Sequence, residues 1–223
     1  CYTEGYSNMS QCPNYGQYDN GNYVFNYYWN FNGTSLPSDW QVISNGGTPS
    51  YTVDNGLIIN NMPSNNCPAS GFQTTETFSP NIIVDFYQEP SIGPGGASVA
   101  TFGFTNENYW AGPTYCSNAI AYIYSPNTNN YQLASGSNAV VTNYQRQLGI
   151  WTIIWTNSQV ESLFNYGDSY SVSTGYTSPS NIGIFGQVDS TYPWIVYWIR
   201  VRAYPPNGVM PSISIGNINS WPP

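Results

Sequence analysis

The chain has 223 residues, a length that suits one sizeable β domain, and it carries 11 acidic side chains, three arginines, no lysine and no histidine. Its formal net charge of −8 excludes a basic nucleic-acid binder, because too few cations are present to neutralise phosphates. The absence of histidine excludes sites that require imidazole, such as Ser-His-Asp catalysis and histidine-ligated zinc.

Residues 1–21 predict an N-terminal extension ahead of a single domain over 22–223. The four cysteines form an even set of the kind that secreted proteins usually oxidise. Of the three possible pairings we favour neighbours along the chain, Cys1 with Cys12 and Cys67 with Cys116. The first bond would close a ring within the extension, and the second a loop of about 50 residues. A lipid-bearing Cys1 is the rival interpretation.

The clearest predicted element is a strand over 22–32. Aromatic residues occupy every second position, which is typical of a half-buried strand with one apolar face. The face expected to be buried contains Tyr23, Phe25, Tyr27, Trp29 and Phe31.

Short alternating segments follow, and the separator Asp54-Asn55-Gly56 is typical of a tight hairpin turn. Helical periodicity is nearly absent, and 21 Gly and 17 Pro disfavour long helices. We therefore predict an all-β fold: a two-sheet antiparallel β-sandwich (jelly roll) with about fourteen short strands and essentially no helix. The remaining predicted strands cover 51–53, 57–60, 71–78, 81–88, 98–105, 119–124, 131–134, 139–143, 149–156, 160–165, 170–173, 181–187, 194–204 and 212–216.

Charged residues make up only 6% of the chain, so neutral amides and hydroxyls must keep its surface hydrated. Because these groups do not titrate at about pH 2 to 4, we hypothesise an acid-stable protein in an acidic extracellular setting. A simple Asn and Tyr bias in a secreted protein is the alternative explanation. Two glycosylation sequons, at Asn8 and Asn32, favour secretion, and no apolar run approaches the length of a membrane span.

Three carboxylates on or beside consecutive predicted strands, Glu76, Asp85 and Glu89, are candidates for convergence. A pair about 5 Å apart would suit retaining glycoside hydrolysis, although isolated carboxylates at strand ends are more often solvated or bonded to turns. A Glu and Gln peptidase site, with Glu89 and either Gln73 or Gln88, is a neighbouring hypothesis.

Aromatic and cationic residues supply the candidate binding surfaces. Strict alternation along 194–204 places Trp194 and Trp198 on one face with Arg200 and Arg202, where the rings and guanidiniums could stack with sugars or with each other. The alternative is Arg–Trp packing with a purely structural role. A second candidate patch near Cys116 consists of Tyr109, Trp110 and Tyr115.

Low charge also removes the usual protection of strand edges against self-association. The strand over 22–32 and the C-terminal residues Ile213 and Ile215 are therefore candidates for completing a neighbouring copy's sheet. The alternative is that both segments pair within their own domain.

The Leu-Pro…Trp turn in 31–40, the Asn-Gly-Leu hairpin in 51–59, the paired segments 149–155 and 160–164, and the closing segment 195–204 resemble concanavalin A-like and laminin-G-like jelly-roll domains. The run Pro205-Pro206-Asn207-Gly208-Val209-Met210-Pro211-Ser212 resembles the terminus of secreted crenarchaeal surface proteins that carry this domain. The resemblance covers about residues 24–216 and implies a jelly-roll fold in an archaeal extracellular protein.

The resemblance does not carry over a catalytic or a metal site. Glucanases of this fold use a Glu-x-Asp-x-Glu strand, and this sequence has no such run. The best counterpart of a lectin calcium site is Asp54-Asn55, which is better explained as a turn. We therefore expect no cofactor, no metal and no enzymatic activity.

The preferred function is a secreted, non-catalytic structural protein. It would be a subunit of an extracellular filament or cell-surface layer, with copies of itself as partners through strand sharing and surface glycans as further partners. The first alternative is a carbohydrate-binding, lectin-like module, and the second is an acid-active glycoside hydrolase or peptidase.

Overall fold

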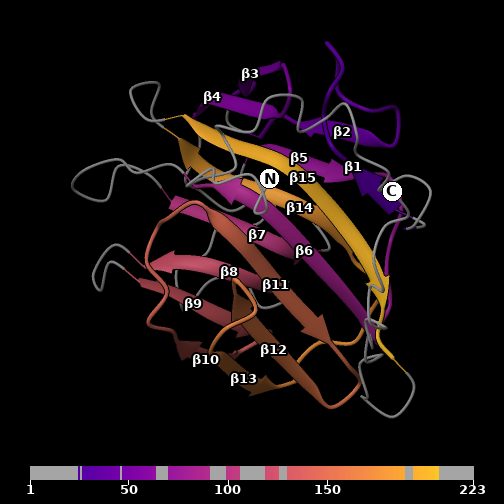
Figure 1. The fold of residues 1–223 in the computed structure, drawn as a ribbon, viewed down its shortest axis with the longest axis vertical. Coiled ribbons are helices and arrows are strands. Elements are labelled where there is room, and N and C mark those ends of the chain that lie inside the picture. The colour runs from indigo at the N-terminus through magenta and orange to yellow at the C-terminus, as the bar shows by residue number, and fades with distance from the viewer. Residues whose placement is uncertain are drawn as a thin grey trace, which may run out of the picture.

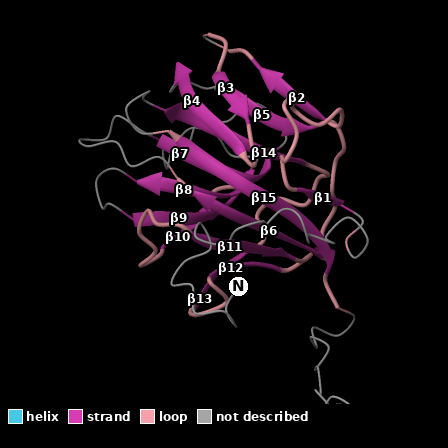
Figure 2. Ribbon diagram, turned by 45° about the horizontal axis from the view of Figure 1, so that its top comes forward, coloured by secondary structure: helices cyan, strands magenta, loops and turns pink. Residues whose placement is uncertain are grey.

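The structure, a computed structural model, describes residues 25, 27–45, 47–63, 70–90, 99–105, 119–125, 130–188 and 193–205. These residues form fifteen β-strands and no helix, arranged as two stacked antiparallel sheets (Figures 1 and 2). The prediction of an all-β, two-sheet sandwich is confirmed.

One layer, sheet A, contains the longest strand of the molecule, β15. Its order is β13–β12–β11–β6–β15–β4–β3, and β1 pairs with the far half of β15 beyond the end of β4. The strands are β1 (Tyr27–Trp29), β3 (Ser50–Val53), β4 (Leu57–Pro63), β6 (Ile82–Glu89), β11 (Gly149–Trp155), β12 (Gln159–Phe164), β13 (Ser169–Ser173) and β15 (Trp194–Ala203).

The other layer, sheet B, has the order β10–β9–β8–β7–β14–β5–β2. Strand β4 belongs to both layers, because its start pairs with β15 and its end pairs with β14. The strands of sheet B are β2 (Trp40–Ile43), β5 (Gly71–Thr74), β7 (Val99–Thr105), β8 (Ala119–Ser125), β9 (Asn130–Ser135), β10 (Asn138–Val141) and β14 (Asn181–Val188).

Aromatic side chains fill the space between the two sheets. Trp151 of sheet A is fully buried, and its ring centroid lies 5.7 Å from Phe102, 5.3 Å from Tyr122 and 4.7 Å from Tyr131, all three on sheet B. Each such ring removes a large apolar area from water, and tilted pairs add about 0.5 to 1.5 kcal/mol beyond that area. Aromatic residues are therefore a large part of the buried core.

The hairpin predicted at Asp54-Asn55-Gly56 is present and joins β3 to β4. Asn55 has a positive φ of 52°, and the Asp54 amide donates to the Gly56 carbonyl, which closes the turn. Strand β2 has no counterpart among the predicted strands.

The strand predicted over 22–32 is much shorter in the structure, because β1 covers only 27–29. Tyr27 and Trp29 do face the core, but Phe31 is buried through a turn, with a φ of 50°, rather than through strand alternation. Phe25 lies before the strand on the other side of the sheet, in contact with Tyr28. The common face expected for these aromatic residues therefore breaks down at both ends.

Several predictions fall outside the described residues and stay predictions. These are the pairing of Cys1, Cys12, Cys67 and Cys116, the extension over 1–21, the sequon at Asn8, and the candidate residues Tyr23, Tyr109, Trp110, Tyr115, Ile213 and Ile215.

Tyr144 links the open ends of the two sheets and gives the fold a measurable pH dependence. Its hydroxyl donates to the carbonyls of Ser162 and Asp168, and burial raises its pKa from 10.0 to about 12. A group whose pKa is higher in the folded chain stabilises the fold below its unfolded pKa, and that contribution is lost as the pH rises through the folded value.

We therefore expect the Tyr144→Phe variant to be less stable than the wild type by about 1 kcal/mol at neutral pH, through the lost hydrogen bonds. The difference should shrink between about pH 10 and 12, where the wild-type phenol ionises in the unfolded chain first. Urea unfolding measured at a series of pH values tests this, and a constant difference throughout that range would contradict it.

Candidate functional site

Strand β15 contains a bulge that changes which of its side chains face outward. Its register with β6 shifts just before Trp198, where Tyr197 is inserted as an extra residue. Trp194, which precedes the bulge, points into the core, whereas Trp198 pairs with the outward-facing Tyr87 of β6. The prediction that both tryptophans share a face with the two arginines of β15 is therefore wrong for Trp194, because strict alternation assumes a strand without a bulge.

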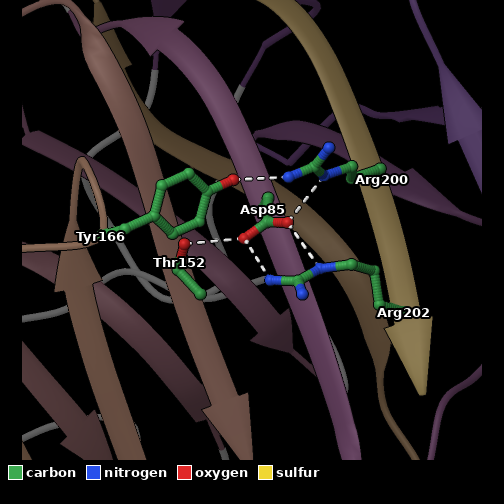
Figure 3. A network of polar contacts seen from close by, with 5 residues as sticks. All are labelled: Asp85, Thr152, Tyr166, Arg200 and Arg202. Carbon is green, nitrogen blue, oxygen red and sulfur yellow. Dashed lines mark hydrogen bonds and ion pairs between the residues drawn. The ribbon is translucent and has the colours of Figure 1, made fainter. Parts of the chain in front are cut away.

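Asp85 lies at the centre of the outer face of sheet A, with Arg200 opposite it on β15 and Thr152 opposite it on β11. Its carboxylate is fully buried. Oδ2 accepts from Nε of Arg200 at 2.7 Å and Nε of Arg202 at 2.9 Å (Figure 3). Oδ1 accepts from Oγ1 of Thr152 at 2.7 Å and Nη2 of Arg202 at 3.3 Å. These contacts occupy about all four lone-pair positions of the carboxylate.

Arg200 is held between two aromatic rings. Its guanidinium carbon lies 4.9 Å from the ring centroid of Phe25 and 5.0 Å from that of Trp198. Burial opposes its charge, but the carboxylate of Asp85 outweighs this effect and raises the pKa of Arg200 above its ordinary value. Arg200 therefore stays charged in a fixed orientation at the surface of the sheet.

Tyr166 reaches the same place from the turn between β12 and β13. Asn165 and Tyr166 both have positive φ values, 49° and 57°, and the Gly167 amide donates to the Phe164 carbonyl. A left-handed conformation costs a bulky residue about 1 to 2 kcal/mol, and such strain is found most often at functional sites. The turn holds the Tyr166 side chain 49% exposed, with its hydroxyl accepting from Nη2 of Arg200.

We call Asp85, Thr152, Tyr166, Arg200 and Arg202 the Asp85 cluster. The sequence pointed to Asp85 and to both arginines, but as parts of two separate hypotheses. Thr152 and Tyr166 had not been identified, because only the pairing of β6 with β11 and the β12–β13 turn brings them to Asp85. In the sequence, only the turn-forming run Asn165-Tyr166-Gly167 hints at the positive φ of Tyr166.

The hypothesis that Glu76, Asp85 and Glu89 converge is wrong. Glu76 lies against Tyr27, whose pKa it raises through a hydrogen bond. Tyr27 packs on the core side of sheet A, whereas Asp85 lies on its outer face. Asp85 and Glu89 share a strand face, but a separation of four residues puts them about 13 Å apart at about 3.3 Å per residue. That distance exceeds the separations of about 5 to 9.5 Å used in glycoside hydrolysis.

The Glu and Gln peptidase site does not form either. Asp85 and Tyr87 face outward on β6, so the side chain of the next residue, Gln88, enters the core. There its Oε1 accepts from Nε1 of Trp194 at 2.9 Å. Glu89 faces the opposite way on the same strand. Gln73 belongs to β5 of the other sheet.

The outer face of sheet B, at its middle level, presents small side chains. The strand registers place them in one line across five strands: Gly183, Gly103, Ala121, Ala134 and Ala139.

No group of three or more Cys, Asp or Glu residues within the described ranges is placed to hold a metal ion. In the same part of the chain, no helix has the length and apolar character needed to cross a membrane.

No protein-family model matches the sequence, and no curated protein is significantly similar to it. Solved structures do share the fold. The apo Crh5 transglycosylase has a TM-score of 0.58 at 13% identity, over 81% of this chain and 85% of that one. The endo-β-1,3-glucanase from Pyrococcus furiosus has a TM-score of 0.58 at 15% identity, over 80% of this chain and 94% of the glucanase. The Emp46p carbohydrate recognition domain has a TM-score of 0.53 at 11% identity, over 82% of this chain and 96% of that domain. The fold is thus the two-sheet jelly roll that these structures share.

These similarities correct two predictions. The expected non-catalytic filament subunit is not supported, because the structures that share the fold are glucanases, a transglycosylase and carbohydrate recognition domains. Within the first segment expected to share strands, Tyr27–Trp29 pair with β15 of their own sheet. The expectation of no enzymatic activity is overturned by the same glycoside hydrolase neighbours.

We expect Asp85→Asn to destabilise the fold strongly, because it leaves two neighbouring guanidiniums without a counter-charge. The loss should be about 2 to 4 kcal/mol, less than for a fully buried pair, since the arginine side chains are 23% and 25% exposed. Asp54→Asn, in the exposed β3–β4 turn, is the control and should change stability by about 0.5 kcal/mol or less. Equal effects of the two substitutions in urea unfolding would contradict a structural role for the ion pairs.

Proposed function

We propose that this protein binds carbohydrate on the outer face of sheet A, at the Asp85 cluster and the rings around it. The observation that carries the proposal is Tyr166, a half-exposed aromatic side chain held against Arg200 by a strained turn. Sugar-binding sites combine an aromatic ring, which packs on the apolar face of a pyranose, with a few oriented polar groups. The Asp85 cluster supplies both.

The rigidity of the cluster also supports the proposal. Arg200 is fixed by Asp85, by two flanking rings and by Tyr166, so little side-chain freedom remains to be lost when a ligand binds. Similar structures also support the proposal, because they include β-glucanases and a carbohydrate recognition domain.

Glycoside hydrolysis is the second candidate, favoured by the fold shared with endo-β-1,3-glucanase and lichenase. Asp85 is not suited to act as acid or nucleophile, because its lone pairs are already occupied by arginine and threonine. Catalysis would therefore depend on other carboxylates. Release of reducing ends from β-1,3-glucan or mixed-linkage β-glucan would establish it, and the absence of release would leave binding alone.

An extracellular location is part of the same proposal. Charged residues are scarce, and the sequon residue Asn32 is exposed, as an attached glycan would require. The resemblance of 205–212 to secreted crenarchaeal surface proteins extends the proposal to an archaeal cell surface and to an acidic setting.

The test of the main proposal is binding to soluble β-1,3-glucan and mixed-linkage β-glucan, measured by calorimetry or affinity electrophoresis. We expect Tyr166→Ala to weaken binding by about threefold to tenfold, because one ring–sugar contact is worth about 0.5 to 1.5 kcal/mol. Tyr166→Phe, which keeps the ring, should retain most of the affinity.

Val141→Ala is the matched control for that experiment. Val141 is 47% exposed, close to the exposure of Tyr166, but it lies on β10 of sheet B. Its substitution should leave binding unchanged. If neither glucan binds, the proposal fails for neutral β-glucans. If the two alanine variants lose affinity equally, the outer face of sheet A is not the binding surface.

A further inference from the structure

The Asp85 cluster carries more positive charge than its own stability requires. Two guanidiniums share one carboxylate, so the cluster has a net charge of +1. The whole chain has only three basic side chains and a formal net charge of −8, yet two of the three stand together here. One arginine would be enough to neutralise Asp85, which leaves the second one to be explained.

Both arginines also have donors to spare. A guanidinium has five N–H groups, and in each of these arginines only Nε and Nη2 make hydrogen bonds among the described residues. Within the part of the chain that the structure describes, the Nη1 groups of Arg200 and Arg202 therefore have no hydrogen-bond partner, and the two neighbouring side chains are about a quarter exposed. Two adjacent planar donors of this kind match the paired oxygens of a carboxylate or a sulfate.

The surroundings limit what else the surface can bind. Trp198, the largest ring beside Arg200, is only 5% exposed, so its face is not free to stack on a sugar. The partly exposed groups of the cluster are the two arginines and Tyr166, whose hydroxyl points at Arg200 (Figure 3). The cluster is thus better suited to a sugar that carries an anionic group than to a neutral sugar alone.

We propose that Arg200 and Arg202 form an anion subsite, which binds the carboxylate or sulfate group of an acidic polysaccharide while Tyr166 contacts its sugar ring. The inference rests on the proposed carbohydrate binding and adds its substrate class. Asp85 and Thr152 act as positioning residues, because they orient the two guanidiniums without meeting the ligand. The anion supplies the second counter-charge that the cluster lacks.

The experiment compares β-1,3-glucan with its sulfated and its C6-oxidised derivatives, which share a backbone and differ only in their anionic groups. At low ionic strength the wild type should bind at least one derivative about tenfold more tightly than the neutral glucan. The preference should fall as salt is added, because the arginines are partly exposed. The derivative that is preferred identifies the anion as sulfate or carboxylate.

Arg202→Gln is the decisive variant, since it removes the surplus charge but leaves the Asp85–Arg200 ion pair in place. We expect it to bind the anionic and the neutral glucans to within about threefold of each other. Gln41→Glu is the matched control: it lowers the net charge by the same amount at an exposed position of β2 on sheet B, and it should keep the preference. If Arg202→Gln does not fold, Arg202→Lys, which keeps the charge without the planar fork, should reduce the preference and retain its dependence on salt.

The outcomes separate this inference from the function on which it rests. Equal binding of neutral and anionic glucans by the wild type, with Tyr166→Ala still impaired, would overturn the anion subsite and leave carbohydrate binding intact. Equal loss of the preference in Arg202→Gln and Gln41→Glu would also overturn it, because the effect would then arise from overall charge. Binding of none of the three glucans would overturn both.

Discussion

The packing of aromatic rings between two sheets is the interaction on which the rest of this structure depends. With so few charged residues, the chain has little electrostatic stabilisation to draw on, and large rings such as Trp151 and Phe102 are fully buried in contact with each other. That packing fixes which side of each strand faces inward. It thereby also determines which side chains are left on the outside to form a site, as Asp85 is on β6.

The outer face of sheet A shows how a single irregularity can create such a site. The bulge at Tyr197 lets one strand bury Trp194 and still present Arg200 and Arg202 to the opposite side. Asp85 and Thr152 then meet the arginines because β6 lies between β11 and β15. A buried carboxylate held by two arginines is costly unless its hydrogen bonds are complete, and here they are.

The sequence predicts the layers of this protein better than it predicts the site. Alternating segments such as 149–155 and 181–187 indicated the strands correctly, because period-two hydrophobicity follows directly from a sheet with one buried face. The bulge at Tyr197 has no signature in the sequence pattern, so Trp194 was assigned to the wrong face of the sheet. The meeting of Tyr166 with Arg200 depends on the order of the strands in space, which local patterns do not contain. The filament function was inferred from low charge and from strand patterns, neither of which contains the fold similarity to glucanases that overturns it.

Strand β4 couples the two layers, since it pairs with β15 at its start and with β14 at its end (Figure 1). Two separate sheets could slide over each other across their apolar interface, as packed layers do in shear motions. A strand that is hydrogen-bonded into both sheets opposes such sliding at one corner of the sandwich. At the opposite corner the layers are tied by a side chain instead of a shared strand, since Nδ2 of Asn138 on β10 donates to the Ser173 carbonyl of β13. Relative sliding of the sheets is therefore opposed at both corners.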